Sequence, residues 1–149
     1  MISAMSADYR PSGFSDITPY LIVEDADRVI EFIKKTFAAE EVLCMRSEEG
    51  GKVTHAAYKI GDSMLELSSS RAEWKPLAAG LHVYVQDVDA CYQRAIAAGG
   101  TSLYEPADMY YGERSGGVAD PCGNQWYLAT VKEDLTLAEV EKRAAQQKS

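Results

Sequence analysis

The sequence predicts an α+β protein in which one strand–helix–three-strand unit occurs twice and a helix follows at the C-terminus. Three observations support this. Strand-like and helix-like segments recur in the same order in both halves of the 149-residue chain. The related pentads V-E-D-A-D and V-Q-D-V-D begin at Val23 and Val85. Turn-forming pairs, Gly50-Gly51 and Gly61-Asp62, separate the short strands of the first half. Agreement of a whole element order indicates an internal duplication.

The first unit is predicted over residues 17–69, after a Ser-, Gly- and Pro-rich arm over residues 1–16. Residues 17–23 form its first strand. A helix opens at Glu24-Asp25 and runs to about Ala38, because Val29, Ile30, Ile33 and Phe37 recur at helical spacing. Three strands are then expected over residues 41–48, 52–60 and 63–69.

A linker over residues 70–79 leads to the second unit, predicted over residues 80–131. Its first strand is L-H-V-Y-V, and Asp87 caps a helix that Gly99-Gly100 ends. Strands are expected near 102–105, 112–119 and 124–131. In residues 132–149, Thr136 and Glu139 are spaced as a capping box and predict a C-terminal helix on the outside or against a second subunit.

Composition narrows the function classes. The formal net charge of −8 disfavours nucleic acid or an anionic membrane as a partner, because phosphate groups require basic contacts. Cys44, Cys91 and Cys122 have no metal-knuckle spacing and are odd in number, so we expect a reducing, cytoplasmic environment. The N-terminal segment does not resemble a signal peptide, and no stretch approaches the about 20 apolar residues of a membrane-spanning helix.

Four segments carry a family resemblance: TPYLIVEDADRVIEFIKKTF, THAAYKIGDSMLELS, LHVYVQDVDACYQRAIAAGG and YGERSGGVADPCGNQWYLAT. With the EDLTLAEVEKR tail they resemble the PhnB-like branch of the vicinal-oxygen-chelate superfamily, the glyoxalase, bleomycin-resistance and dioxygenase group. The resemblance runs from about Asp16 to Ala145. It implies paired βαβββ modules whose mixed sheets form a cup for a small molecule, often completed by homodimerisation. Members include metal-dependent lyases and isomerases as well as metal-free sequestering proteins.

The resemblance also implies where a divalent metal would bind. Family enzymes take ligands from the first and last strands of each module. Alignment of the two pentads places Thr18 and Gly80 on the first strands, with Glu66 and Tyr127 on the last strands. Of these four, only Glu66 is a usual ligand type. A shift of two residues keeps the same strand face and brings Tyr20 and His82 to those places, with His55 as a further donor.

Glu66 is expected on the cup face, because Leu65 and Leu67 alternate with it, and it is the candidate general base or cation-binding group. Arg114 is either an anion clamp or a structural partner of Glu113 or Asp120. Tyrosines on predicted cup positions suit a flat or apolar ligand. The candidate ligand-binding residues are therefore Tyr20, Glu66, His82, Tyr84, Tyr111, Arg114 and Tyr127.

Two functions follow from these residues. The first is a protein that binds or sequesters a small cationic or aromatic molecule in a tyrosine-lined cup, with no cofactor and no family-type metal site. The alternative is a divalent-metal-dependent lyase or isomerase that uses Glu66 and His82. Cys122, in the turn D-P-C-G-N, is more readily a structural residue than a nucleophile, because no histidine is near it in sequence.

Overall fold

A computed structural model describes residues 8–147 and confirms the duplicated α+β architecture. The first module consists of β1 (Tyr20–Val23), α1 (Ala26–Phe37), β2 (Glu40–Arg46), β3 (Val53–Ile60) and β4 (Ser63–Ser69). The second consists of β5 (Gly80–Tyr84), α2 (Val88–Ala97), β6 (Thr101–Asp108), β7 (Glu113–Ala119) and β8 (Gln125–Val131). Helix α3 (Leu137–Gln146) follows, and Thr136 and Glu139 form the predicted capping box.

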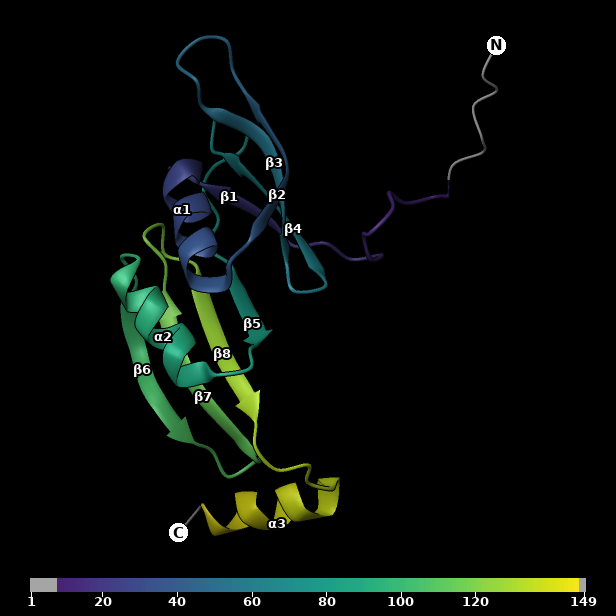
Figure 1. Ribbon diagram of the computed structural model, residues 1–149, viewed down its shortest axis with the longest axis vertical. Coiled ribbons are helices and arrows are strands. Elements are labelled where there is room, and N and C mark those ends of the chain that lie inside the picture. The colour runs from purple at the N-terminus through teal and green to yellow at the C-terminus, as the bar shows by residue number, and fades with distance from the viewer. Residues whose placement is uncertain (1–7, 148–149) are drawn as a thin grey trace.

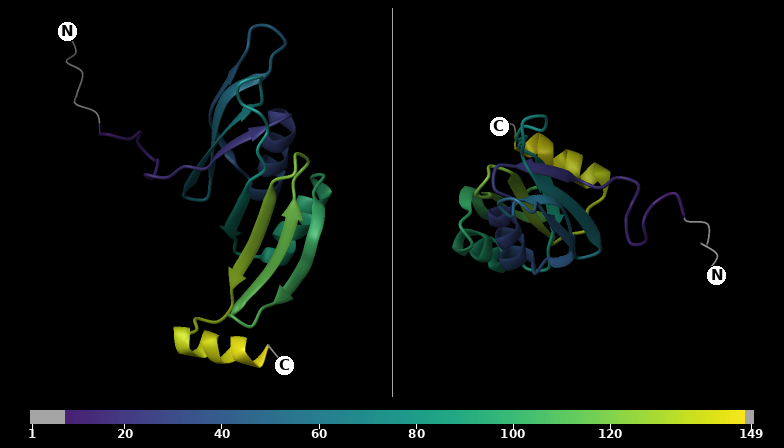
Figure 2. Two further views of the ribbon diagram at one scale, coloured as in Figure 1. Left: turned by 180° about the vertical axis from the view of Figure 1, so that it is seen from behind. Right: turned by 90° about the horizontal axis from the view of Figure 1, so that it is seen from above.

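Each module is a four-stranded mixed sheet with the same topology. The strand orders are β1-β4-β3-β2 and β5-β8-β7-β6, and in each sheet the first strand lies parallel to the last. The two modules follow one another along the long axis of the molecule, and α1 and α2 cover the same side of their sheets (Figure 1). The opposite face of each sheet, which we call its open face, carries no helix (Figure 2).

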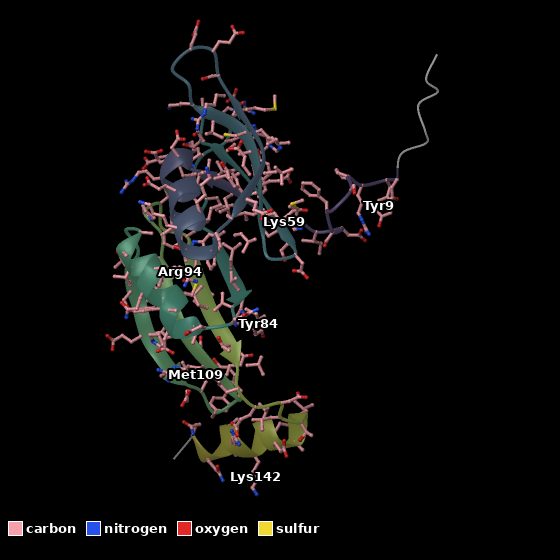
Figure 3. The ribbon with its side chains drawn as sticks, in the orientation of Figure 1. Tyr9, Lys59, Tyr84, Arg94, Met109 and Lys142 are labelled. Carbon is pink, nitrogen blue, oxygen red and sulfur yellow. The ribbon has the colours of Figure 1, made fainter. Side chains whose placement is uncertain are left out.

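The helix-covered faces form the core, and one hydrophobic cluster includes residues of both modules. Trp126 of β8 is 1% exposed, and its ring contacts Phe32 and Phe37 of α1 at centroid distances of 6.0 and 5.2 Å. Trp126 therefore packs against helix α1. Where the helices meet, Arg94 Nε donates to the carbonyl of Thr36 at 3.1 Å (labelled in Figure 3). These contacts join the two modules through their helices.

Helix α3 is attached differently. None of its residues is buried, and it lies beyond the end of the second sheet (Figure 1). Arg143 ties it to the sheet through Glu133, at 2.6 Å, and through the carbonyl of Tyr110, at 3.3 Å. It is therefore held by polar contacts more than by apolar burial.

The outer and inner edges of the two sheets differ. The outer strands β2 and β6 each contain two register shifts, and β6 also contains Pro106. Such features prevent further strand pairing. The inner strands β1 and β5 pair in continuous register and have no proline. Strand β1 receives one bridge, from Leu77 to Ile22, whereas β5 is a free edge.

Candidate functional site

The open face of the first module carries a phenol, an imidazole and a carboxylate in contact. The register places Tyr20 of β1 opposite Glu66 of β4, and His55 of β3 lies on the same face. His55 Nε2 is 3.3 Å from Glu66 Oε1, and His55 Nδ1 is 3.3 Å from the Tyr20 hydroxyl. The rings of Tyr20 and His55 are stacked. We call these three residues the first trio.

Alternation explains how Glu66 reaches this face. Leu65 and Leu67 are 3% and 0% exposed because they point toward α1, so the residue between them points away from it. The predicted orientation of Glu66 is confirmed. Around the first trio the face is apolar and open, since Leu43 and Met45 of β2 share it and are both exposed.

The open face of the second module carries the same three chemical groups. Glu113 of β7 accepts a hydrogen bond from the Tyr84 hydroxyl at 3.1 Å, and its other oxygen is 3.8 Å from His82 Nε2. The hydrogen bond to Glu113 raises the pKa of Tyr84. His82 and Tyr84 also contact each other, with ring centroids 4.7 Å apart. Tyr84, His82 and Glu113 form the second trio, and Figure 3 shows Tyr84 at the end of β5 on the side away from α2.

Further tyrosines surround the second trio. The Tyr104 hydroxyl lies 2.9 Å from Ser115 Oγ, and its ring covers Gly117. Tyr111 neighbours Tyr104 and Ser115, and burial raises the pKa of its phenol. Tyr127 lies opposite His82 in the register and donates to Gln125. The predicted concentration of tyrosines on this face is therefore present in the structure.

A groove of about 700 Å³ lies beside the second trio. Its walls are the segment before β1, the β3–β4 turn, and β5 with the loop after it, where residues 81–86 line it without interruption. Phe37 of α1, Arg94 of α2 and Trp126 of β8 also line it, so the groove lies between the two modules. His82 and Tyr84 belong to its lining, whereas His55 and Glu66 do not. Because it follows the free edge of β5, the groove has both apolar side chains and strand backbone along one wall. Its volume lies within the range typical of small-molecule sites.

The remaining candidate, Arg114, lies on the other side of the sheet. Its guanidinium binds Asp89 of α2, at 2.7 and 3.0 Å, and Asp108 at 3.2 Å. These carboxylates raise the pKa of Arg114 further above its usual value. The structure therefore does not bring Arg114 together with the cup-facing candidates, and its partners are neither Glu113 nor Asp120.

The turn before β8 is a structural network. The buried carboxylate of Asp120 accepts hydrogen bonds from two backbone amides, those of Cys122 and Asn124, and from the side chains of Asn124 and Trp126. Asn124 Oδ1 in turn accepts from the backbone amide of Ala79 in the linker. Burial raises the pKa of the Cys122 thiol, whose sulfur donates to the carbonyl of Asp25. A raised thiol pKa disfavours nucleophilic chemistry at Cys122.

Two residues of the trios are not among the ligand-binding residues expected from the sequence. The sequence suggests His55 only as a further metal donor and Glu113 only as a partner of Arg114. A signal for Glu113 exists in the sequence. Residues 113, 115 and 117 alternate with Arg114, Gly116 and Val118, so one set must face the cup. Which set does so depends on the pairing with β8, which joins Gly117 to Tyr127.

These features define a class of protein: a duplicated βαβββ fold in which each open sheet face carries a tyrosine, a histidine and a glutamate. The family model described as Glyoxalase/Bleomycin resistance protein/Dioxygenase superfamily matches residues 14–128. The chain belongs to this superfamily.

Individual relatives agree with this assignment. An uncharacterized protein of Mycobacterium bovis is 32% identical over 142 residues, covering 88% of this chain and 93% of its own. A PhnB protein from Bacillus cereus superposes with a TM-score of 0.66 at 21% identity, covering 78% of this chain and 100% of that one. The fosfomycin resistance protein FosX from Listeria monocytogenes, solved with Mn(II) and sulfate, superposes with a TM-score of 0.61 at 20% identity, covering 97% and 99%. The last two likenesses show a shared fold.

The residues of this chain do not match a family-type metal site. The register places Tyr20 opposite Glu66 and His82 opposite Tyr127, so the shift of two residues is the arrangement in the structure. This set supplies one carboxylate, one imidazole and two phenols. Within residues 8–147, no three histidine, cysteine, aspartate or glutamate side chains converge as a metal site requires. The donors of one protomer therefore do not fit the family's divalent ion.

Proposed function

We propose that this protein binds or sequesters a small cationic or aromatic molecule between its open sheet faces. The observation that carries the proposal is the pair of trios. Each module presents one carboxylate beside an imidazole and a phenol, and further tyrosine rings line the face of the second module. A tyrosine ring attracts a cation through its electron-rich face, and a carboxylate adds direct charge attraction. Planar aromatic ligands also pack well against such rings.

The charges around the trios support a cationic ligand. Two arginines of the modules pair with carboxylates away from the trios: Arg46 binds Asp27 and Arg114 binds Asp89. Arg94 lines the groove and donates to the backbone carbonyl of Thr36. Glu66 and Glu113 pair with histidines, which are charged only when protonated. Within residues 8–147 neither carboxylate has an arginine or lysine partner, which favours a ligand that brings positive charge.

The cup is completed by a second copy in this proposal. Tyr20, Leu43 and Met45 form an exposed apolar area around the first trio, and such areas favour association. The occupant is a second copy because β5 offers a free strand edge and the outer edges of both sheets are irregular. We expect a dimer by light scattering of the purified protein, and weaker association in Met45→Glu. A wild-type monomer at micromolar concentration would contradict this part of the proposal.

The proposed location is the cytoplasm. All three cysteines are free thiols, which suits a reducing compartment. Among residues 8–147 there is no helix of the length and apolar character that crossing a bilayer requires.

The binding proposal is tested by a thermal-shift panel of aromatic cations and their neutral isosteres. The panel is run on wild type, on Glu66→Gln and on Glu49→Gln, a control in the exposed β2–β3 turn. We expect at least one cation to raise the melting temperature of wild type and the control, and to do so less in Glu66→Gln. Equal responses to cations and neutral isosteres, or equal responses of all three proteins, would contradict the proposal.

The alternative is a divalent-metal-dependent lyase or isomerase that uses Glu66 and His82. One observation favours it: each of these residues has a donor of the other type beside it, His55 and Glu113 respectively. If the two open faces came together, the pair Glu66 and His55 and the pair His82 and Glu113 would supply four metal donors. Elemental analysis of the purified protein and titration with Zn²⁺ and Mn²⁺ decide the matter. One equivalent of metal, lost in Glu66→Ala, would favour the alternative over the binding proposal.

A further inference from the structure

We infer that the second trio is a cation-binding half-site in its own right, so that the completed cup takes a ligand with two cationic groups. The inference rests on the proposed function, in which Glu66 meets one positive group. It adds Glu113, with His82 and Tyr84, as the site for a second positive group. A ligand of this kind is a dication with aromatic character.

Contacts and burial support this role for Glu113. Its side chain is 16% exposed, less than the 27% of Glu66. One oxygen accepts from the Tyr84 hydroxyl and the other faces His82. A carboxylate that is largely removed from water without a permanently charged partner binds a cation more strongly than an exposed one.

The position of Glu113 excludes the simplest structural explanation. Arg114 is adjacent in sequence, but alternation along β7 turns it to the helix-covered side, where Asp89 and Asp108 bind it. Glu113 therefore does not serve to neutralise Arg114. Its partners are two ring side chains from β5, and both line the groove of about 700 Å³. Glu113 itself does not line that groove, but a ligand there contacts His82 and Tyr84, the two side chains that touch Glu113.

The two trios also lie in different modules, which separates the two charges. The first belongs to β1, β3 and β4, and the second to β5 and β7. A single small cation occupies only one of them at a time. A ligand with two positive groups joined by a spacer of suitable length occupies both, and the second contact then forms at a high effective concentration.

The experiment compares benzamidine, which carries one amidinium, with bis-benzamidines whose two groups are joined by alkyl chains of increasing length. Dissociation constants are measured by calorimetry on wild type, Glu66→Gln, Glu113→Gln and the control Glu49→Gln. We expect the best bis-benzamidine to bind wild type at least about tenfold more tightly than benzamidine does. Either trio substitution removes most of that gain, and the control retains it.

The outcomes separate this inference from the proposed function. Failure of every amidine to bind wild type overturns this inference, whereas the thermal-shift panel decides the proposed function separately. A second outcome overturns the second half-site alone. In that outcome benzamidine binds through Glu66, no bis-benzamidine binds more tightly than benzamidine, and Glu113→Gln changes no dissociation constant. The ratio of the two affinities in wild type decides the question even where Glu113→Gln does not fold. Tyr84→Phe, which removes one hydroxyl and retains the ring, is then expected to reduce the gain severalfold.

Discussion

The two modules agree closely in the residues that build the fold and differ in those that face the cup. Asp25 and Asp87 cap α1 and α2 with nearly equal backbone angles, φ −135° and ψ 93° against φ −136° and ψ 96°. The open faces carry the same three chemical groups at different strand positions, because Tyr20 and Glu66 occupy the places that His82 and Tyr127 occupy in the second sheet. These positions are exposed or half-exposed, so packing constrains their residue types less than it constrains the core.

The turns before the last strands differ most, and they give the largest expected effect. Asp120→Ala leaves the amides of Cys122 and Asn124 and the indole of Trp126 without their acceptor. Because these donors are in a buried turn, we expect a loss of about 3 kcal/mol in the free energy of unfolding, measured by urea denaturation. The matched change in the first module, Asp62→Ala, affects an exposed turn and should cost less than about 0.5 kcal/mol. Similar losses in both variants would contradict this contrast.

The next effect concerns Gly117, whose equivalent in the first module is Ala57. Both lie on the third strand of their sheet, opposite Tyr127 and Glu66 respectively. A Cβ at Gly117 would approach the ring of Tyr104 to 2.5 Å. Gly117→Ala must therefore displace Tyr104, and we expect a cost of about 1 to 3 kcal/mol.

Removing the ring tests the cause of that cost. In the background Tyr104→Leu, the change Gly117→Ala should cost much less, because a shorter side chain leaves room for the methyl group. Calorimetric melting of the four proteins measures the coupling. Additive effects of the two substitutions would show that Tyr104 is not the obstacle.

The helix caps should behave alike in both modules. Asp25 accepts from the amide of Arg28 at 3.3 Å, and Asp87 accepts from the amide of Ala90 at 3.1 Å. Each Asp→Ala substitution should cost about 1 kcal/mol in the free energy of unfolding. Asp→Asn at either position is the control and should cost less, because asparagine is also a good cap. If the costs of the two Asp→Ala substitutions differed by more than about 1 kcal/mol, the caps would not be equivalent, although their backbone angles are nearly equal.

The smallest effect is expected at the exposed ion pairs that connect each helix to its sheet. Arg46 binds Asp27 in the first module, and Arg114 binds Asp89 in the second. Hydrogen bonds from these arginines lower the pKa of both aspartates. Their stabilisation is therefore present above the unfolded-state pKa and is lost as the pH falls through the lower folded-state value.

Asp27→Asn and Asp89→Asn should lower the melting temperature by less than about 3 °C at pH 7, because exposed ion pairs contribute little. The difference from wild type should shrink as the pH falls toward 3. A difference that grows at low pH would contradict the direction of the pKa shifts.

Local pattern was sufficient to predict much of the fold from the sequence. The element order, the caps Asp25 and Asp87, and the capping box at Thr136 follow from residues close together in the chain. The orientation of Glu66 follows from its alternation with two leucines. Boundaries were less accurate, since β1 begins at Tyr20 where a strand was expected from residue 17.

The site was less predictable because it depends on register between strands. The contact between His55 and Glu66 requires β3 and β4 to pair in one particular register, and strand length alone does not define that register. The orientation of Glu113 likewise depends on the register between β7 and β8. Arg114 binds Asp89, which lies on α2, a helix 25 residues earlier in the chain. Sequence supplied the residue types, and the pairing of distant strands decided which of them meet.

Calorimetric titration with benzamidine and with its neutral isostere benzamide tests the central claim most directly. The claim is that a carboxylate beside a tyrosine on an open sheet face binds an aromatic cation. Wild type should bind benzamidine more tightly than benzamide, and Glu66→Gln should reduce that preference about tenfold or more while Glu49→Gln leaves it unchanged. Equal affinities for benzamidine and benzamide in wild type, or a preference that survives Glu66→Gln, would contradict the account.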